Sequence, residues 1–141
     1  MIILDTNVVS ELMKAAPAER VLGWIAAQPA SALYTTSITE AEILHGLALL
    51  PTGKRRNALE SAAEAMLSED FAGRILPFGS DAAHAYARIA ADRRRAGRPI
   101  SHFDAQIAAI ARRHGMGVAT RNVDDFAGCG IAVTTPWVPP P

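Results

Sequence analysis

Short apolar segments alternate with helical patterns along nearly the whole chain, and this alternation limits the possible folds more than any other feature. Apolar runs of only a few residues, bounded by turn residues, are typical of strands buried in a parallel sheet. The longer segments between them repeat their apolar residues every three or four positions, which is typical of helices packed on such a sheet. We therefore predict an α/β fold: a single domain with a central, mostly parallel sheet flanked by helices.

The same patterns place the individual elements. The predicted strands are 2–4, 33–35, 74–78, 117–120 and 131–134. The predicted helices are 8–14, 18–28, 39–50, 54–68, 80–96 and 101–114. In the last helix, Phe103, Ile107, Ile110 and Ala111 follow the helical period, so we expect all four to face the core. Residues 1–135 are expected to form the domain, and the proline-rich segment 136–141 a C-terminal tail that cannot continue regular structure.

Composition narrows the class of protein. A chain of 141 residues that is 50% hydrophobic is long enough for one core and too short for two ordinary domains. Lys plus Arg equals Asp plus Glu at 14 each, so any nucleic-acid contact must come from local clusters. The single cysteine, Cys129, excludes an intrachain disulfide and a cysteine-rich zinc site. No apolar run approaches the ~20 residues of a membrane span, so we expect a cytoplasmic protein without a membrane segment.

Acidic residues stand where helices begin. Asp5 directly follows the first predicted strand. Glu42 and Asp104 each lie three positions after a hydroxyl residue, Thr39 and Ser101, at the start of an apolar helical run. That spacing is typical of a capping box, in which the side chains satisfy the free N–H groups of the first helical turn. Capping therefore explains each acid when it is taken alone.

Capping does not explain why the acids follow strands that should be neighbours. The carboxyl ends of parallel strands share one edge of a sheet, where ligands bind. Asp5 follows the first strand and Glu42 lies beyond the second, while Asn122, Asp124 and Asp125 follow the strand 117–120. We therefore expect these side chains to meet.

A cluster of carboxylates at this edge implies a cation. Two carboxylates about 5 Å apart repel by roughly 3 kcal/mol at an effective dielectric constant near 20. A divalent ion offsets this repulsion, and a ligand set with oxygen atoms only suits Mg²⁺ or Mn²⁺. Such a site activates water for attack on a phosphodiester, and the sequence offers no persuasive covalent nucleophile. Asp104 has no strand directly before it, so the topology alone supports its place in the cluster less well.

Five segments, in order along nearly the whole chain, carry a family resemblance: MIILDTNVVSEL, SITEAEILHGL, SHFDAQIAAIARRHG, VATRNVDDF and TTPW. Together they resemble the PIN-domain ribonucleases, and within them the VapC and FitB type toxins of bacterial toxin-antitoxin modules. The resemblance implies a Mg²⁺-dependent endoribonuclease that cuts RNA, in which Mn²⁺ can substitute. It also implies a cognate antitoxin protein that holds the enzyme inactive, and a homodimer.

The resemblance assigns roles to particular residues. It matches the acids of the metal site and the hydroxyl residue beside the first of them: Asp5, Glu42, Asp104 and Thr6. Asn122 stands where some relatives have an acid, with Asp124 and Asp125 close behind, so the residue that completes the site is open among these three. Asn122 and Asp125 are retained as catalytic candidates. Glu40, on another face of the same helix, is interpreted as an exposed acid favoured by the helix dipole.

Basic residues are candidates for RNA contacts. Arg121 lies next to the expected site and is predicted to bind substrate. The runs Lys54-Arg55-Arg56 and Arg93-Arg94-Arg95, with Arg98, either contact phosphates or form solvated surfaces.

Two other functions are compatible with parts of the sequence. The main alternative is a catalytically inactive α/β binding module whose acids are helix caps. Its partner surface would be helical faces that carry Val9, Leu12, Met13 and Trp24, although such residues more often belong to a core. The other alternative, an aspartyl phosphotransferase, requires Asp-x-Asp after the first strand, and Asn7 breaks that pattern.

Overall fold

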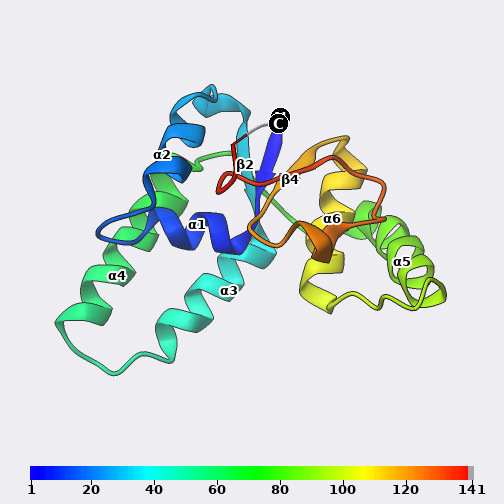
Figure 1. Ribbon diagram of the computed structural model, residues 1–141. Coiled ribbons are helices and arrows are strands. Elements are labelled where there is room, and N and C mark those ends of the chain that lie inside the picture. Colours follow the sequence, from blue (N-terminus) through cyan, green and yellow to red (C-terminus); the bar gives the residue numbers. More distant parts are fainter. Residues whose placement is uncertain (140–141) are drawn as a thin grey trace.

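Five parallel strands form the centre of the computed structural model, which describes residues 1–139 (Figure 1). The strands are β1 (Ile2–Leu4), β2 (Leu33–Thr36), β3 (Ile75–Leu76), β4 (Gly117–Ala119) and β5 (Val133–Thr134). Their order across the sheet is β3-β2-β1-β4-β5, and every neighbouring pair is parallel. The predicted α/β fold is confirmed, although β3 and β5 are shorter than expected. Positions 140–141 of the predicted tail lie outside the described residues.

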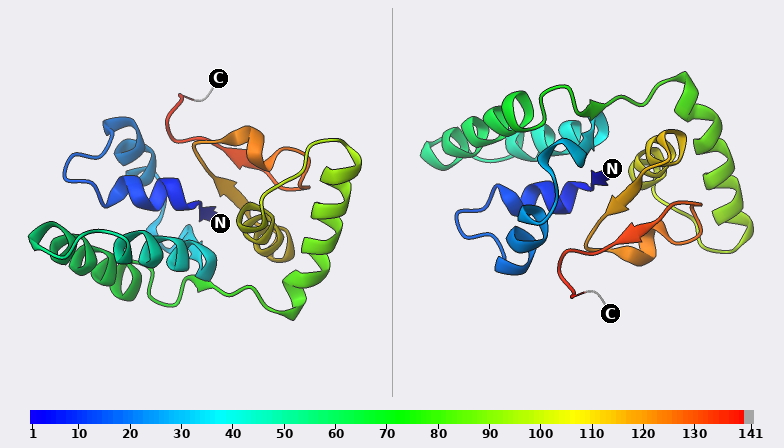
Figure 2. Two further views of the ribbon diagram at one scale, coloured as in Figure 1. Left: turned by 90° about the horizontal axis from the view of Figure 1, so that it is seen from below. Right: turned by 90° about the horizontal axis from the view of Figure 1, so that it is seen from above.

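Helices cover both faces of this sheet (Figures 1 and 2). They are α1 (Thr6–Leu12), α2 (Glu19–Ala26), α3 (Ser37–Ala48), α4 (Lys54–Ala65), α5 (Ser80–Arg95) and α6 (His102–His114). Shorter turns lie at η1 (Ala30–Ala32), η2 (Met66–Asp70) and η3 (Val123–Phe126). Among the described residues, no helix has both the length and the apolar character needed to cross a membrane.

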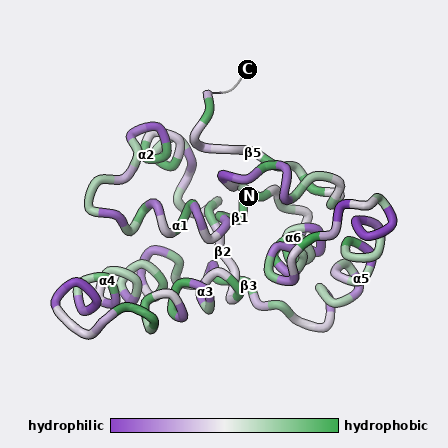
Figure 3. The backbone as a smooth tube through the Cα atoms, turned by 60° about the horizontal axis from the view of Figure 1, so that its bottom comes forward, coloured by the Kyte–Doolittle hydropathy of each residue, from purple (hydrophilic) through white to green (hydrophobic). Residues whose placement is uncertain are grey.

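The two central strands supply both hydrophobic cores. Neighbouring residues of a strand point to opposite faces of the sheet. Ile3 and Val118 therefore pack with α5 and α6, whereas Leu4 and Ala119 pack with α1 to α4, and all four are fully buried. Hydrophilic stretches lie on the outer parts of α4 and α5 (Figure 3).

Residues proposed as an alternative partner surface belong mostly to the second core. Val9 is fully buried, and Leu12, Met13 and Trp24 are partly buried against the same cluster. Their interpretation as core residues is confirmed. Cys129 lies in the first core as a free thiol.

Helix α3 begins earlier than predicted, and this changes the role of Glu42. The N-cap is Thr36, the last residue of β2, whose Oγ1 accepts a hydrogen bond from the Thr39 N–H at 3.1 Å. Glu42 therefore lies in the second turn of α3, where it cannot form a capping box with Thr39. The capping interpretation of Glu42 is wrong because Thr36, six positions before Glu42, already caps the helix.

Helix α6 begins as predicted but exposes its first aromatic residue. Ser101 is the N-cap, and its Oγ accepts a hydrogen bond from the Asp104 N–H at 3.2 Å. Ile107 and Ile110 are fully buried, whereas Phe103 is 56% exposed. The expectation that Phe103 faces the core is wrong, because its neighbours across the surface are small or exposed residues of α3 that do not cover its ring.

Candidate functional site

An acidic cavity of about 490 Å³ lies where β1 and β4 lead into the segments that follow them. We call it the acidic cavity throughout. Its lining residues are Asp5, Thr6, Asn7, Ser10, Glu11, Lys14, Glu42, Asp104, Arg121, Asn122 and Asp125. The structure thus brings together the acids, Thr6, Asn122 and Arg121 that the sequence singled out, with one exception: Asp124, which was also expected to meet them, does not line the cavity.

Asp5 is the most constrained of these acids. It is the N-cap of α1, and its Oδ1 accepts a hydrogen bond from the Thr6 N–H at 2.8 Å. Its Oδ2 accepts a hydrogen bond from the Thr120 hydroxyl, also at 2.8 Å. Burial, with smaller contributions from the charges of Asp104 and Glu42, raises the pKa of Asp5 to about 6 in spite of these two bonds. Asp5 is both a helix cap and part of the cluster.

Glu42 reaches the same cavity from α3. Its Oε1 accepts a hydrogen bond from the Thr6 hydroxyl at 2.9 Å, and Thr6 Oγ1 lies 3.0 Å from Thr39 Oγ1. Burial raises the pKa of Glu42, the Thr6 bond opposes this, and the charge of Asp104 adds to the increase. Thr6 therefore links α1 to the carboxylate of α3.

Asp104 enters the cavity from the first turn of α6, without a strand directly before it. Burial raises its pKa, and the hydrogen bond with Ser101 opposes the shift. The charge of Asp125 raises the pKa as well, while Arg93 lowers it. Asp5, Glu42 and Asp104 thus each carry a negative charge that burial and a neighbouring carboxylate both disfavour.

The corner beyond β4 distinguishes the candidates for the fourth position. Asn122 and Asp125 line the acidic cavity, and Asp124 does not. The Asn122 N–H donates to the Thr120 hydroxyl at 3.1 Å, and Thr120 in turn donates to Asp5. The peptide of Asn122 is therefore connected to Asp5 through a single side chain.

These acids share the cavity without converging on one point. Within residues 1–139, no three His, Cys, Asp or Glu side chains are arranged to hold a metal ion in this conformation. The donors are carboxylate and amide oxygens, which is the ligand type that Mg²⁺ and Mn²⁺ prefer. Asp104 and Glu42 are only partly buried, so their side chains have room to turn toward an ion.

Arg93 has a structural role that the sequence did not indicate. It is buried, and its Nη1 donates to the carbonyl oxygens of Asp125 and Ala127 at 2.9 Å each. Its Nε donates to the Arg98 carbonyl at 2.6 Å. Both expectations for this basic run, phosphate contact or a solvated surface, are wrong for Arg93, although Arg94 and Arg95 are exposed. Arg93 holds the turn that carries Asp125.

The other basic candidates remain at the surface. Arg56 pairs with Glu60 at 2.6 Å within α4, whereas Lys54 and Arg55 are exposed. The guanidinium carbon of Arg121 lies 5.1 Å from the centre of the Trp137 ring, a cation–π contact that holds it at the rim of the acidic cavity.

Sequence reasoning missed several supporting residues. Thr120 donates its hydroxyl hydrogen to Asp5 and directly follows β4. A polar residue at the carboxyl end of a buried strand was the sequence signal that could have identified it. Glu11 is buried and bound by Lys14 Nζ at 2.9 Å, and this contact lowers the pKa of Glu11. Its other oxygen accepts from the Ala18 N–H at 3.1 Å. No motif marks Glu11 in the sequence.

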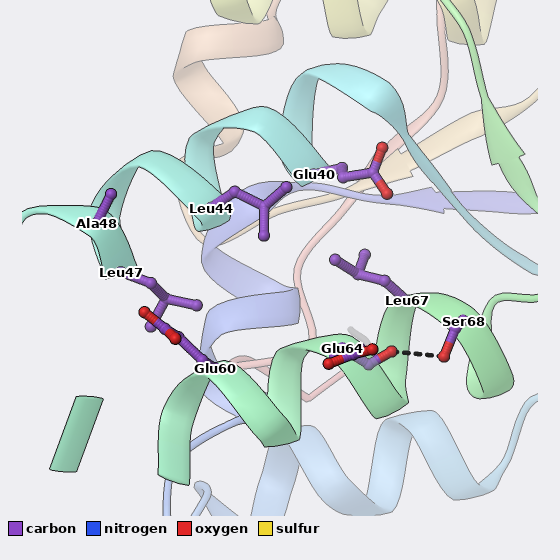
Figure 4. Close-up of a pocket in the computed structure, with 8 residues that line it drawn as sticks. All are labelled: Glu40, Leu44, Leu47, Ala48, Glu60, Glu64, Leu67 and Ser68. Carbon is purple, nitrogen blue, oxygen red and sulfur yellow. Dashed lines mark hydrogen bonds between the residues drawn. The ribbon is translucent and has the colours of Figure 1, made fainter. Parts of the chain in front are cut away.

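A separate groove lies between α3 and α4 (Figure 4). Leu44 and Leu67 point into it, and carboxylates surround them. The full lining is Glu40, Leu44, Leu47, Ala48, Glu60, Glu64, Leu67 and Ser68. Glu40 faces this groove, which we call the α3–α4 groove, and Glu42 faces the acidic cavity.

The sequence matches the PIN domain family over residues 2–128, and the chain belongs to that family. It is 45% identical to VapC ribonuclease Y4jK of Sinorhizobium fredii over 99% of both chains. It is 42% identical to toxin FitB of Neisseria gonorrhoeae, covering 97% of this chain and 99% of that one. A solved structure of FitAB bound to a DNA fragment superposes with a TM-score of 0.94 at 41% identity, covering 100% of this chain and 99% of that chain.

Proposed function

We propose that this protein is a Mg²⁺-dependent endoribonuclease and the toxin of a toxin-antitoxin module. One observation carries the proposal: the acids matched by family resemblance line a single cavity, and three of them have raised pKa values. Burying negative charge without a partner is unfavourable, and a divalent cation relieves it. The relatives named as a VapC ribonuclease and a FitB toxin support the same activity.

Asp5, Glu42 and Asp104 are the residues that would hold Mg²⁺, or Mn²⁺ in its place. When bound, the ion lowers the pKa of a water molecule and offsets charge on the scissile phosphate. Since the carboxylates do not converge in this conformation, we expect Glu42 and Asp104 to turn inward on binding. Asp5 is already fixed by Thr6 and Thr120 and provides the rigid corner of the site.

The remaining polar residues of the acidic cavity orient the reaction. Thr6 holds Glu42 through its hydroxyl and is the positioning residue for that carboxylate. Asp125 adds a fourth negative charge opposite Asp104, and Asn122 offers a neutral amide to a water molecule or a phosphate. Arg121, at the rim, would bind a phosphate of the RNA on either side of the cut.

An antitoxin partner is proposed from the relatives and from the shape of the surface. The FitAB and VapBC structures are named as complexes. In this chain a largely apolar groove, lined by residues such as Met13, Ile43 and Leu59, shares Thr6 and Glu42 with the acidic cavity. A protein segment bound along this groove would reach the acids and block them. We place the protein in the cytoplasm, where RNA is available.

A homodimer is proposed from the exposed leucines of α3 and its C-cap. Leu44 is 51% exposed inside the α3–α4 groove, and Leu49, at the end of α3, is 72% exposed. Leu44 shares this groove with Leu47 and Leu67, and apolar side chains that gather at a surface mark association sites.

The decisive experiment compares RNA cleavage in Mg²⁺ with cleavage in EDTA. We expect repurified protein to cut single-stranded RNA in Mg²⁺ or Mn²⁺ and to lose the activity in chelator. Cleavage that persists in EDTA would rule out the metal mechanism. Absence of both cleavage and Mg²⁺ binding would favour an inactive binding module. In cells, expression of the chain alone should slow growth, and co-expression of the antitoxin should restore it.

A further inference from the structure

Another cavity shares Glu42 with the acidic cavity. It has a volume of about 290 Å³ and is lined by Ala41, Glu42, His45, Gly46 and Phe103. Glu42 lines both cavities, so a ligand that occupies one lies beside the other. We call this second space the side cavity.

Phe103 is unusual among the apolar residues of its helix. The apolar residues that follow it in α6, from Ala105 to Ala111, are buried, whereas Phe103 is 56% exposed. It directly precedes Asp104, so its position is tied to the candidate metal site. A large aromatic ring left open to water beside a functional cavity is available for a ligand.

Gly46 is the second observation that points to a ligand. It lies inside α3, where glycine is less favourable than alanine. A Cβ built on Gly46 would meet no atom within 4 Å, so packing within the chain does not require glycine there. Its φ is not positive, so the backbone does not require glycine either. Gly46 lines the side cavity and also the apolar groove beside Met13, Ile43 and Leu59, and its missing side chain leaves space open at that place.

We propose that the side cavity binds one nucleobase of the RNA, that of the nucleotide next to the phosphate held in the acidic cavity. This rests on the proposed ribonuclease function. Phe103 offers a flat aromatic face, on which any base stacks, and His45 offers a ring nitrogen for a hydrogen bond. Among the described residues that line the side cavity, the one carboxylate is that of Glu42, which repels a phosphate. The chemistry of the side cavity therefore suits a neutral planar ring.

The first test measures binding of a fluorescein-labelled single-stranded RNA to protein carrying the inactivating Asp5→Asn change. Adding Phe103→Ala should weaken binding about tenfold, and adding Phe103→Tyr should leave it nearly unchanged, since stacking survives. An otherwise identical RNA with abasic nucleotides should bind equally to the Asp5→Asn protein with and without Phe103→Ala. Equal affinity of these two proteins for intact RNA overturns the proposal.

The second test uses a matched pair of glycines. Gly23 lies inside α2 and, like Gly46, would place a Cβ in open space, but it lines none of the cavities described above. Gly46→Ala and Gly23→Ala should both raise the melting temperature. Only Gly46→Ala should also weaken RNA binding. A Gly46→Ala protein that is more stable and binds RNA like its parent shows that the side cavity does not hold the base.

Cleavage separates this inference from the proposed function. If the wild-type protein cuts RNA, mapping of the new 5′ ends should show a base preference beside the cut that Phe103→Ala relaxes. An unchanged preference contradicts the base site while leaving the nuclease in place. If the wild-type protein does not cut RNA but binds it through Phe103, the base site stands and the nuclease does not. If Phe103→Ala turns a dimer into a monomer with unchanged RNA affinity, Phe103 is a protein contact and the base site is overturned.

Discussion

Thr6 in the first turn of α1 donates its hydroxyl hydrogen to Glu42 Oε1 in the second turn of α3, at 2.9 Å. This contact joins two residues that are 36 positions apart, and it aims the Glu42 carboxylate at the acidic cavity. Since Thr36 caps α3, nothing in the helix itself requires an acid at position 42.

Glu42→Gln should separate structure from chemistry. Glutamine keeps an oxygen that can accept the Thr6 hydrogen bond, and it removes a charge that burial disfavours. We expect the free energy of unfolding to change by less than about 0.5 kcal/mol or to rise slightly. RNA cleavage should fall by roughly 100-fold or more, because a positioned catalytic group is lost. Glu40→Gln, in the same helix but facing the α3–α4 groove, is the control and should cut like wild type. Wild-type cleavage by Glu42→Gln would remove Glu42 from the site.

Asp124 and Asp125 should differ although they are adjacent. Asp125 lines the acidic cavity and raises the pKa of Asp104 by its charge, whereas Asp124 does not line it. Asp125→Asn should weaken Mg²⁺ binding, measured by isothermal titration, and slow cleavage, while Asp124→Asn should match wild type. If both variants match wild type while Asn122→Ala is inactive, this corner of the site needs no acid.

Asp5 should make the metal-free protein less stable as the pH rises. Its pKa is about 6 in the folded protein against an ordinary value of 3.8. Below pH 3.8 the Asp5 carboxyl is protonated in both the folded and the unfolded state, so it does not change the free energy of unfolding. Between pH 3.8 and 6 this carboxyl ionises in the unfolded chain but stays protonated in the folded protein, so the folded state loses stability. Above pH 6 the loss is complete, at roughly 3 kcal/mol for a shift of this size.

Asp5→Asn tests this in urea denaturation with EDTA present. The variant should be more stable than wild type at about pH 7.5, by at most about 3 kcal/mol, and the advantage should shrink as the pH falls from about 6 to about 4. Adding Mg²⁺ should then stabilise wild type and leave Asp5→Asn unchanged. An effect of Asp5→Asn that is the same at every pH would mean that the buried charge is not the cause.

Arg93→Met should destabilise the protein. Three backbone carbonyl oxygens, those of Arg98, Asp125 and Ala127, would lose a charged donor in a buried place. We expect the free energy of unfolding to fall by about 2–4 kcal/mol. Arg94→Met, at the next position on the exposed side of α5, should change it by less than about 0.5 kcal/mol. If Arg93→Met leaves the free energy of unfolding unchanged, the turn that carries Asp125 does not depend on Arg93.

Leu44→Asp tests the proposed dimer. Leu44 is half-exposed, so aspartate there should leave the fold intact while adding a charge to a groove already surrounded by carboxylates. We expect sedimentation to change from a dimer to a monomer. The control Leu22→Asp, at a position that is 43% exposed on α2, should not alter the mass. A dimer that survives Leu44→Asp uses another surface.

The parts of the site that follow strands were predictable from the sequence. An apolar run ending in an acid places that acid at the edge where parallel strands end, and this located Asp5, Asn122 and Asp125 but not Asp124, which follows the same strand and lies outside the cavity. Asp104 could be placed only through the family resemblance, because α6 is not preceded by a strand.

The errors have a common physical origin in competition between neighbouring residues. Several hydroxyl residues lie between Thr35 and Thr39, and the end of β2, not the spacing to an acid, selected Thr36 as the cap of α3. The helical period shows which side of a helix faces the core, but not how far the neighbouring helix covers that side. Phe103 was therefore expected to be buried. A run of basic residues does not show which side chain is buried. Arg93 is buried because it donates hydrogen bonds to the carbonyl oxygens of Asp125 and Ala127, in a turn far away in the sequence.

The hydrogen bond from Thr120 to Asp5 spans 115 positions of the chain. During synthesis the amino-terminal half leaves the ribosome first, and it carries Asp5, Thr6 and Glu42 without Asp104, Thr120 or Asp125. A partly made chain therefore has only one side of the acidic cavity, and β1 lacks its neighbour β4. The acidic cavity is therefore complete only after β4 and the segment that follows it have been made.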